Sequence, residues 1–232
     1  MIEEKTIGEI VAEDIRTANV FNQYGLDFCC GGGKTVHAAC AEKGINPEEL
    51  LNSIRSVTDS TAPVEQFMEM SLDKLIDHIY DQHHLYIYKH GKPTAEFINK
   101  VARVHGERHP ETIEIAKLYN DLLADLNQHM MKEEQILFPA IKRIVTESGN
   151  FGSFINGPIT VMKMEHDNAG EILKKMDQLS NSYSLPEDAC NTYRAAYSNL
   201  KALEDNIHVH IHLENNILFP KALSLEEQLM DS

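Results

Sequence analysis

The stretch that decides the fold is His129-Met-Met-Lys-Glu133-Glu-Gln-Ile-Leu-Phe-Pro139, which has a second copy, His210-Ile-His-Leu-Glu214-Asn-Asn-Ile-Leu-Phe-Pro220. Residues four positions apart lie on one face of an α-helix, so the histidine and the glutamate of each copy point the same way. A single His-x-x-x-Glu is common on helices and carries little information. Two copies in the same register, each followed by Ile-Leu-Phe-Pro, indicate two equivalent helices that present polar side chains to one place.

A further histidine precedes each copy by nearly the same distance. His84 lies 45 residues before the first copy, and His166 lies 44 residues before the second. Facing residues of an antiparallel helical hairpin are about equally far from its turn, and the midpoints of these intervals fall close to Gly106 and Pro186. Glycine and proline are typical turn residues. The spacing therefore predicts two hairpins, each with one histidine on its first helix.

The rest of the pattern is helical. Apolar residues recur with a helical period from Ser71 onward, and no strand-like alternation persists. We predict an all-α chain whose second part is a four-helix up-down bundle. The predicted helices cover residues 72–105, 111–146, 158–181 and 187–217. The predicted domains are a small helical domain at 1–57, a linker at 58–70 and the bundle at 71–225.

Four imidazoles and two carboxylates buried at one point are costly without a cation. This set contains no sulfur and suits iron, manganese or zinc. Two carboxylates that can bridge favour two metal ions, which in such sites lie roughly 3.5–4 Å apart. The predicted ligands of this metal centre are His84, His129, Glu133, His166, His210 and Glu214.

His105 is a ligand only under a different topology. On one continuous helix it lies about 31 Å from His84 and cannot share the site. If the chain instead reverses at Gly91-Lys92-Pro93, His105 returns as a candidate. On the continuous helix, the same segment has to be a kink.

Other polar residues near the predicted ligands have lesser expected roles. Glu134 and Glu165 neighbour ligands but point elsewhere on their helices, so we expect them at most to support the ligands. Pro139 and Pro220 are expected to end or kink the helix just past the site. Six histidines are expected at the surface or in supporting positions: His78, His83, His90, His109, His208 and His212.

The N-terminal part is expected to hold short capped helices and a cysteine loop. Thr6 with Glu9 forms a capping-box pattern, and Asn46-Pro47 is a strong helix start. Between them, Cys29-Cys30 precede three glycines and then a predicted helix start. Thiols near a helix N-terminus have lowered pKa values, so we predict reactive or metal-handling thiols, in redox or transfer chemistry, rather than two small loop residues. Cys40 and Cys190 are interpreted as apolar packing residues.

The amino-acid composition and net charge exclude several classes of partner. The chain has 21 Lys and Arg against 36 Asp and Glu, a net charge of -15. Such a surface repels nucleic acid and anionic lipid, so neither is an expected partner. No apolar run is long enough to span a membrane, and the acidic N-terminus does not resemble a secretory signal. We expect a cytoplasmic protein whose cysteines stay reduced.

The chain resembles the bacterial repair-of-iron-centres family, the di-iron iron-sulfur cluster repair proteins. The resemblance covers almost the whole chain. It rests on Tyr24-Gly-Leu-Asp-Phe-Cys-Cys-Gly-Gly-Gly and on the hemerythrin-like ligand pattern described above. It implies a cytoplasmic stress-response protein with a non-haem di-iron centre bridged by Glu133 and Glu214. Such proteins restore iron-sulfur clusters damaged by nitric oxide and peroxide, by supplying labile iron or reacting with nitric oxide.

Two other functions remain open at this stage. One is a hemerythrin-like carrier or sensor of dioxygen or nitric oxide, although such carriers typically use five histidines where this chain offers four. The other is a nitric oxide reductase at the same centre. Damaged iron-sulfur proteins are the expected partners, nitric oxide or dioxygen the expected ligands, and the sequence also permits a homodimer.

Overall fold

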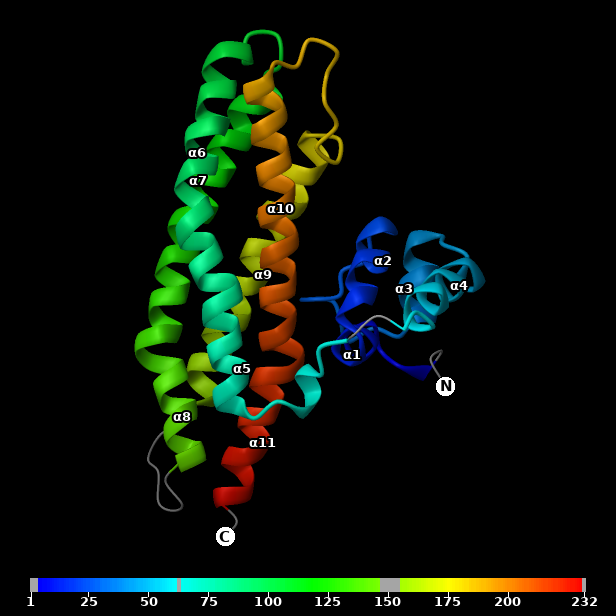
Figure 1. Ribbon diagram of the computed structural model, residues 1–232, viewed down its shortest axis with the longest axis vertical. Helices are drawn as coiled ribbons and strands as arrows, with labels where there is room; N and C mark the ends of the chain where they lie inside the picture. The colour runs from blue at the N-terminus through cyan, green and yellow to red at the C-terminus, as the bar shows by residue number, and fades with distance from the viewer. Residues whose placement is uncertain (1–3, 62–63, 147–154, 231–232) are drawn as a thin grey trace. The chain divides into compact units, whose positions relative to one another are not determined.

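The protein is helical throughout the part that the structure describes. The computed structural model describes residues 4–61, 64–146 and 155–230 (Figure 1). These ranges hold no β-strand, and Thr6 and Thr35 form only an isolated bridge. The predicted all-α class is confirmed. No helix within these ranges is both long and apolar enough to cross a membrane.

The chain divides into two compact units. One consists of residues 77–143 and 153–207, and the other of residues 1–76, 144–152 and 208–232. The border at residue 207 falls inside one continuous helix. The predicted linker at 58–70 holds a 3₁₀ turn, Phe67–Glu69, and its role as a domain boundary stays a prediction.

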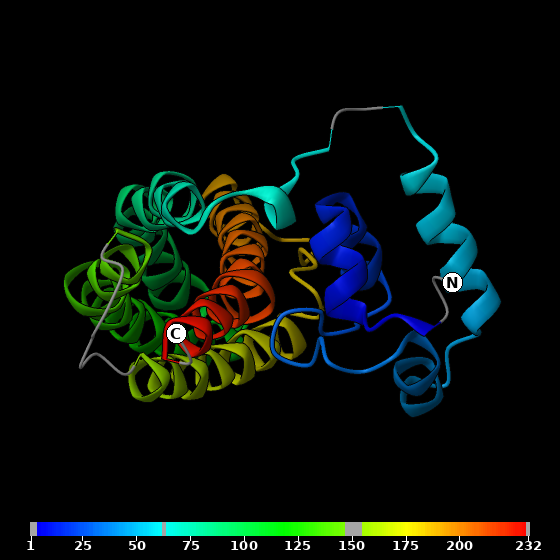
Figure 2. The ribbon, with the colours of Figure 1, turned by 90° about the horizontal axis from the view of Figure 1, so that it is seen from below.

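Four helices of the first unit run alternately up and down, as predicted (Figure 1). Figure 2 looks along these helices and shows them grouped around a common core. Their buried faces carry apolar residues at helical spacing, such as Ile98, Ile115, Leu122 and Leu173. The bounds of the helices from the linker onward are α5 Leu72–Ile79, α6 Leu85–His105, α7 Glu111–Lys132, α8 Phe138–Thr146, α9 Asn156–Leu179, α10 Asn191–Leu213 and α11 Phe219–Met230.

The helix α6 continues through Gly91-Lys92-Pro93 without reversing. A Cβ atom at Gly91 would lie 2.6 Å from Cδ1 of Leu123, so glycine permits α6 and α7 to approach closely here. The Tyr119 hydroxyl of α7 donates a hydrogen bond of 2.9 Å to the Gly91 carbonyl. His105 therefore lies at the end of α6, and the alternative topology that made it a metal ligand is wrong.

Three π-helical turns interrupt the long helices. They are Tyr80–His84, Glu133–Leu137 and Glu214–Leu218, and each begins or ends at a predicted ligand. Of the two outcomes expected at Pro139 and Pro220, an end of the helix is excluded, because α8 and α11 continue past the two prolines. A proline lacks the N–H that the carbonyl four residues earlier needs, and a wider turn ahead of it relieves that mismatch.

The short N-terminal helices follow their capping signals. The helices are α1 Ile7–Glu13, α2 Ala18–Gln23, α3 Val36–Lys43 and α4 Pro47–Thr58. Thr6 and Glu9 form the predicted capping box, and the side chain of Asn46 caps α4. Gly44 ends α3 at φ 66°, a conformation that favours glycine. Apolar residues of these helices, among them Phe21 and Ile54, are fully buried.

Candidate metal centre

The six predicted ligands are all buried ionisable side chains. None is more than 3% exposed, and His84, Glu133 and Glu214 are fully buried. His129 and Glu133 stand at the junction of α7 with its π turn, and His210 and Glu214 stand at the equivalent junction after α10. Burying a carboxylate at such a position costs free energy unless a cation or hydrogen bonds offset its charge.

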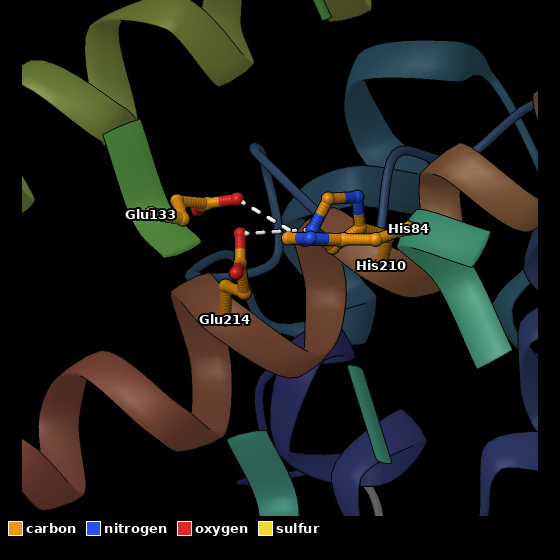
Figure 3. Close-up of side chains that lie close together, drawn as sticks. All are labelled: His84, Glu133, His210 and Glu214. Carbon is orange, nitrogen blue, oxygen red and sulfur yellow. Dashed lines mark ion pairs between the residues drawn. The ribbon is translucent and has the colours of Figure 1, made fainter. Parts of the chain in front are cut away.

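Ligand atoms of these side chains gather in two overlapping groups. Single atoms of His84, Glu133, His210 and Glu214 lie within 4.8 Å of one another (Figure 3). The same holds for His129, Glu133, His166 and Glu214. Both groups contain the same two glutamates. The structure therefore brings all six predicted side chains together.

The close pairs show how each carboxylate meets imidazole nitrogens. Oε1 of Glu133 lies 3.1 Å from Nε2 of His129, and its Oε2 lies 3.3 Å from Nε2 of His84. Oε2 of Glu214 lies 3.4 Å from Nε2 of His210. In Figure 3 the two carboxylates face the imidazoles of His84 and His210. Each oxygen of Glu133 thus faces a different histidine.

The outer nitrogens of two histidines are held by further carboxylates. Nδ1 of His84 lies 2.8 Å from Oε1 of Glu134, and Nδ1 of His129 lies 2.9 Å from Oε2 of Glu165. Lys132 also pairs with Glu165. Such contacts fix the ring orientation and leave Nε2 directed at the site. The supporting role expected of Glu134 and Glu165 agrees with these contacts.

The acidity of the supporting groups follows their surroundings. Partial burial works to raise the pKa of Glu165, but the hydrogen bonds from Lys132 and His129 hold it below its ordinary value. Glu165 is therefore an anion at neutral pH. Burial, together with a hydrogen bond to Glu134, raises the pKa of Tyr88 to about 12, so its hydroxyl keeps its proton and donates to Glu134 at 3.0 Å.

Two histidines expected in surface or supporting positions are buried. Nδ1 of His83 lies 3.2 Å from Oδ1 of Asn206. Nδ1 of His212 lies 3.3 Å from the carbonyl oxygen of Phe28, and burial lowers its pKa to about 4. A neutral His212 therefore donates to the backbone of the cysteine loop. Sequence periodicity gave no sign of this contact, because its partner lies 184 residues away.

The cysteine loop is organised by Asp27, which the sequence did not single out. Oδ1 of Asp27 accepts hydrogen bonds from the backbone N–H groups of Cys29, at 2.9 Å, and Cys30, at 3.0 Å. Asp27, Cys29 and Cys30 form a third group of possible metal ligands. Within the same unit, Asn216 donates from Nδ2 to the Cys29 carbonyl at 3.2 Å. The loop is thus tied to the residues that flank Glu214.

The expected lowering of the thiol pKa is wrong for Cys29. A hydrogen bond with Cys30, burial and the charge of Asp27 raise its pKa well above the ordinary value. The next helix begins only at Val36, so Cys29 does not stand in its first turn, where the helix dipole acts most strongly. Cys29 is therefore a protonated thiol until a metal ion or a reaction partner displaces the proton.

The other two cysteines differ from each other. Cys40 is fully buried among apolar residues, as expected of a packing residue. Cys190 is exposed, so the packing role expected for it is wrong. Its Sγ lies 3.3 Å from Nε2 of His105. His105, which its place at the end of α6 excludes as a metal ligand, thus contacts a cysteine that was expected to be an apolar packing residue.

Comparison with known protein families finds a matching family model for each of the two parts of the chain. The family model described as the hemerythrin HHE cation binding domain matches residues 75–222. A second model, ScdA_N, described as a domain of unknown function (DUF542), matches residues 3–58. Domains of the first kind bind metal cations, and the buried histidines and glutamates of this chain suit that role.

Several relatives match over almost the whole length. Proteins named iron-sulfur cluster repair protein YtfE from Citrobacter koseri, Enterobacter sp. and Escherichia coli O8 are each 36% identical to it over 227 residues. These matches cover 96% of this chain and 98% of each relative. The chain therefore belongs to the iron-sulfur cluster repair protein family, in which an N-terminal ScdA_N domain precedes a hemerythrin-type cation-binding domain.

Proposed function

We propose that the buried site holds two iron ions and that Glu133 and Glu214 bridge them. The observation that carries this proposal is that both groups of ligand atoms contain the same two glutamates. Two separate mononuclear sites would each need carboxylates of their own. The proposed ligands are His84, His129, Glu133, His166, His210 and Glu214.

The donor set fits iron on chemical grounds. Imidazole and carboxylate donors suit iron, zinc or manganese, and the group contains no thiolate. Two carboxylates at this depth repel each other, and divalent cations offset that repulsion. The six side chains divide into two histidines per ion and two carboxylates that the ions would share, which leaves coordination positions for a small ligand such as nitric oxide or dioxygen.

We propose that this centre serves the repair of iron-sulfur clusters damaged by nitrosative and oxidative stress. The names of the full-length relatives support this function. The iron centre would supply exchangeable iron or a binding place for nitric oxide. The clients would be damaged iron-sulfur proteins of the cytoplasm, where the free cysteines of this chain stay reduced.

The residues of the chain itself prepare the site for this role. Glu134 and Glu165 hold the outer nitrogens of His84 and His129, so that the inner nitrogens face the metal. The ring of Phe138 stacks on the His84 imidazole with centroids 5.5 Å apart and shields that side of the site from water. We further propose that Cys29 and Cys30, with Asp27, handle iron or thiols during repair, which their shared ligand group supports.

One experiment tests the function. The chain is purified anaerobically, its iron is counted, and it is incubated with an iron-sulfur enzyme inactivated by nitric oxide. We expect about two irons per chain and recovery of the client enzyme. Glu133→Leu should lose at least half of the iron and most of the recovery, whereas Cys29→Ala/Cys30→Ala should keep the iron and lose recovery. Full iron in Glu133→Leu would refute the bridging role, and full recovery by the double variant would refute the role of the thiols.

Two other activities at the same centre are outcomes of this experiment. A carrier or sensor of dioxygen or nitric oxide would bind the gas reversibly and restore no client. A nitric oxide reductase would release nitrous oxide over many turnovers, so the gas phase is analysed in parallel. A stoichiometric yield of nitrous oxide would count against catalysis.

A further inference from the structure

A second group of reactive side chains lies at the end of the bundle, apart from the metal centre. The exposed Cys190 immediately precedes α10, and its carbonyl accepts the first helical hydrogen bond, from Arg194, at 3.0 Å. Nε2 of His105 lies 3.3 Å from its Sγ. His105 ends α6, the helix that starts just after His84, and 21 residues of helix span about 31 Å. The pair is therefore far from His84, although all three residues lie in the same unit.

The position of Cys190 favours its thiolate. Backbone N–H groups of Tyr193 and Thr192, at the start of a helix of 23 residues, hydrogen-bond the sulfur. Although slight burial opposes them, these contacts lower the pKa of Cys190 below its ordinary value. By contrast, the pKa values of Cys29 and Cys40 are raised. Cys190 thus combines exposure with an acidic thiol, the two conditions for reactivity.

His105 supplies a base in a fixed place. Its ring is only 5% exposed, and Nδ1 has no hydrogen-bond partner among the residues that the structure describes. Nε2 points at the Cys190 sulfur, so the pair resembles the nucleophile and base of thiol chemistry. The Tyr193 ring packs against the imidazole with centroids 5.3 Å apart. A buried imidazole that has one nitrogen without a partner and the other directed at an exposed thiol is costly to keep unless it has a use.

Ionic contacts hold the loop that carries Cys190. Asp188 accepts from Nε2 of His109 at 2.9 Å and pairs with Arg108 at 2.8 Å. Nδ1 of His109 also lies 3.4 Å from Glu111. Each of these charged groups is thus engaged with a partner of its own. They leave His105 as the group that faces the thiol directly.

A surface cavity adjoins the pair through Tyr193. Its volume is about 280 Å³, and residues lining it include Glu111, Ser180, Leu185, Pro186, Tyr193 and Tyr197. Hydroxyl, carboxylate and aromatic groups together suit a small polar organic molecule. The cavity thus lies against Tyr193, the residue whose ring packs on His105, and has room for a group larger than a peroxide.

We propose that Cys190 is a modification site that forms a mixed disulfide with a low-molecular-weight thiol. The thiol passes its proton to Nε2 of His105, and the resulting thiolate attacks one sulfur of a small disulfide. The new bond joins Sγ of Cys190 to that sulfur, the original sulfur-sulfur bond breaks, and the other half leaves as a thiolate that takes up the proton. The protein thiol is oxidised, and half of the small disulfide is reduced. His105 acts here as a positioned base, and no metal takes part.

The test uses the full chain with glutathione disulfide as the probe. Trypsin releases Cys190 in residues 176–194, Cys40 in 35–43 and Cys29 with Cys30 in 17–34, so mass spectrometry resolves the sites. We expect the glutathione adduct to appear first on 176–194. Its rate should rise with pH through an inflection below the free-thiol value of about 8.5. An inflection at the free-thiol value, or adducts equally fast on 35–43, would overturn the proposal.

Variants separate the role of His105 from a structural one. His105→Phe should move the inflection upward toward the free-thiol value and slow the reaction at neutral pH severalfold. His109→Phe is the matched control, since that ring also contacts Tyr193 but faces Asp188, and its profile should stay unchanged. Circular dichroism checks the fold of each variant. If His105→Phe does not fold, the pH profile of the unmodified chain still decides.

Discussion

At the scale of the residue, the site depends on the carboxylates that hold the outer histidine nitrogens as well as on the proposed ligands. Glu165 reaches His129 from α9, a different helix, and Lys132 holds it in place. Glu165 and His129 are 36 positions apart, and helical periodicity does not relate residues on different helices. The sequence therefore indicated that Glu165 is near the site, but not that His129 is its partner. That the six proposed ligands come together was predictable, because the same motif occurs twice.

We expect Glu165→Gln to weaken metal binding. A neutral amide holds the His129 ring less firmly than the carboxylate does, and loss of such a partner typically costs about 10–100-fold in metal affinity. Competition with a coloured chelator measures the change. Glu171→Gln, on the same helix but paired only with Lys174 at the surface, should bind iron as the unmodified chain does. Equal affinities in both variants would contradict the role of Glu165.

Glu204 gives a prediction about pH. It is 6% exposed, and burial raises its pKa to about 7. The folded chain therefore holds this proton more tightly than the unfolded chain, so stability falls as pH rises from about 4.5 through 7. Glu204→Gln removes the titration and should raise the free energy of unfolding at pH 8 by about 2–3 kcal/mol.

Urea unfolding at about pH 5 and pH 8 measures this difference. At pH 5 the unmodified chain and Glu204→Gln should differ much less than at pH 8, because Glu204 is then still protonated in the folded state. The exposed Glu96 offers the control, and Glu96→Gln should leave the pH dependence as it is. If Glu204→Gln raised the free energy of unfolding by the same amount at both pH values, burial of the charged carboxylate would not be the cause of the gain.

At the scale of the element, the feature that sequence reasoning missed is the π turn. Pro139 and Pro220 indicated an interruption, which was expected to be either an end or a kink of the helix. The chain instead widens one turn, from Glu133 to Leu137, and then resumes an α-helix. Propensity rules describe where helices start and stop, but an internal change of helix type depends on packing at the site.

Pro139→Ala tests whether the proline maintains this turn. Alanine restores the missing N–H and has a higher helix propensity, so the metal-free chain should become more stable by about 1–3 kcal/mol. The turn that aims Glu133 should then narrow, and iron should be held less tightly. Pro93→Ala, within the α-helical α6, should give a similar gain with unchanged iron binding. Equal iron binding in the two variants would mean that the proline does not shape the site.

At the scale of the whole molecule, the number and direction of the long helices followed from intervals between histidines. The fourth helical segment begins at Asn191 rather than 187 and continues to Met230 rather than 217. The contacts of His212 and Asn216 with the cysteine loop were not predictable, since they depend on how distant segments fold together. The N-terminal helices were predictable because their caps are local.

Ligands drawn from helices far apart in the sequence should make stability depend on metal. Binding to the folded chain alone stabilises it by about 4 kcal/mol when free metal exceeds the dissociation constant a thousandfold. We expect a chelator to lower the midpoint of thermal unfolding of the unmodified chain markedly. The same chelator should have little effect on Glu133→Leu. An unchanged midpoint after iron removal would show that the helices are fully preorganised without it.

The π turns also alter the heptad frame of the helices that contain them. Buried positions advance by seven from Leu126 to Glu133, but by eight from Glu133 to Ile141. The second copy does the same, with seven from Ile207 to Glu214 and eight from Glu214 to Ala222. Each ligand glutamate thus marks a phase shift of one residue. In a bundle with an unbroken heptad repeat, buried positions recur every seven residues without this extra residue. An interval of eight residues after a buried glutamate is therefore a signature that distinguishes a helix of this kind from a helix that serves packing alone.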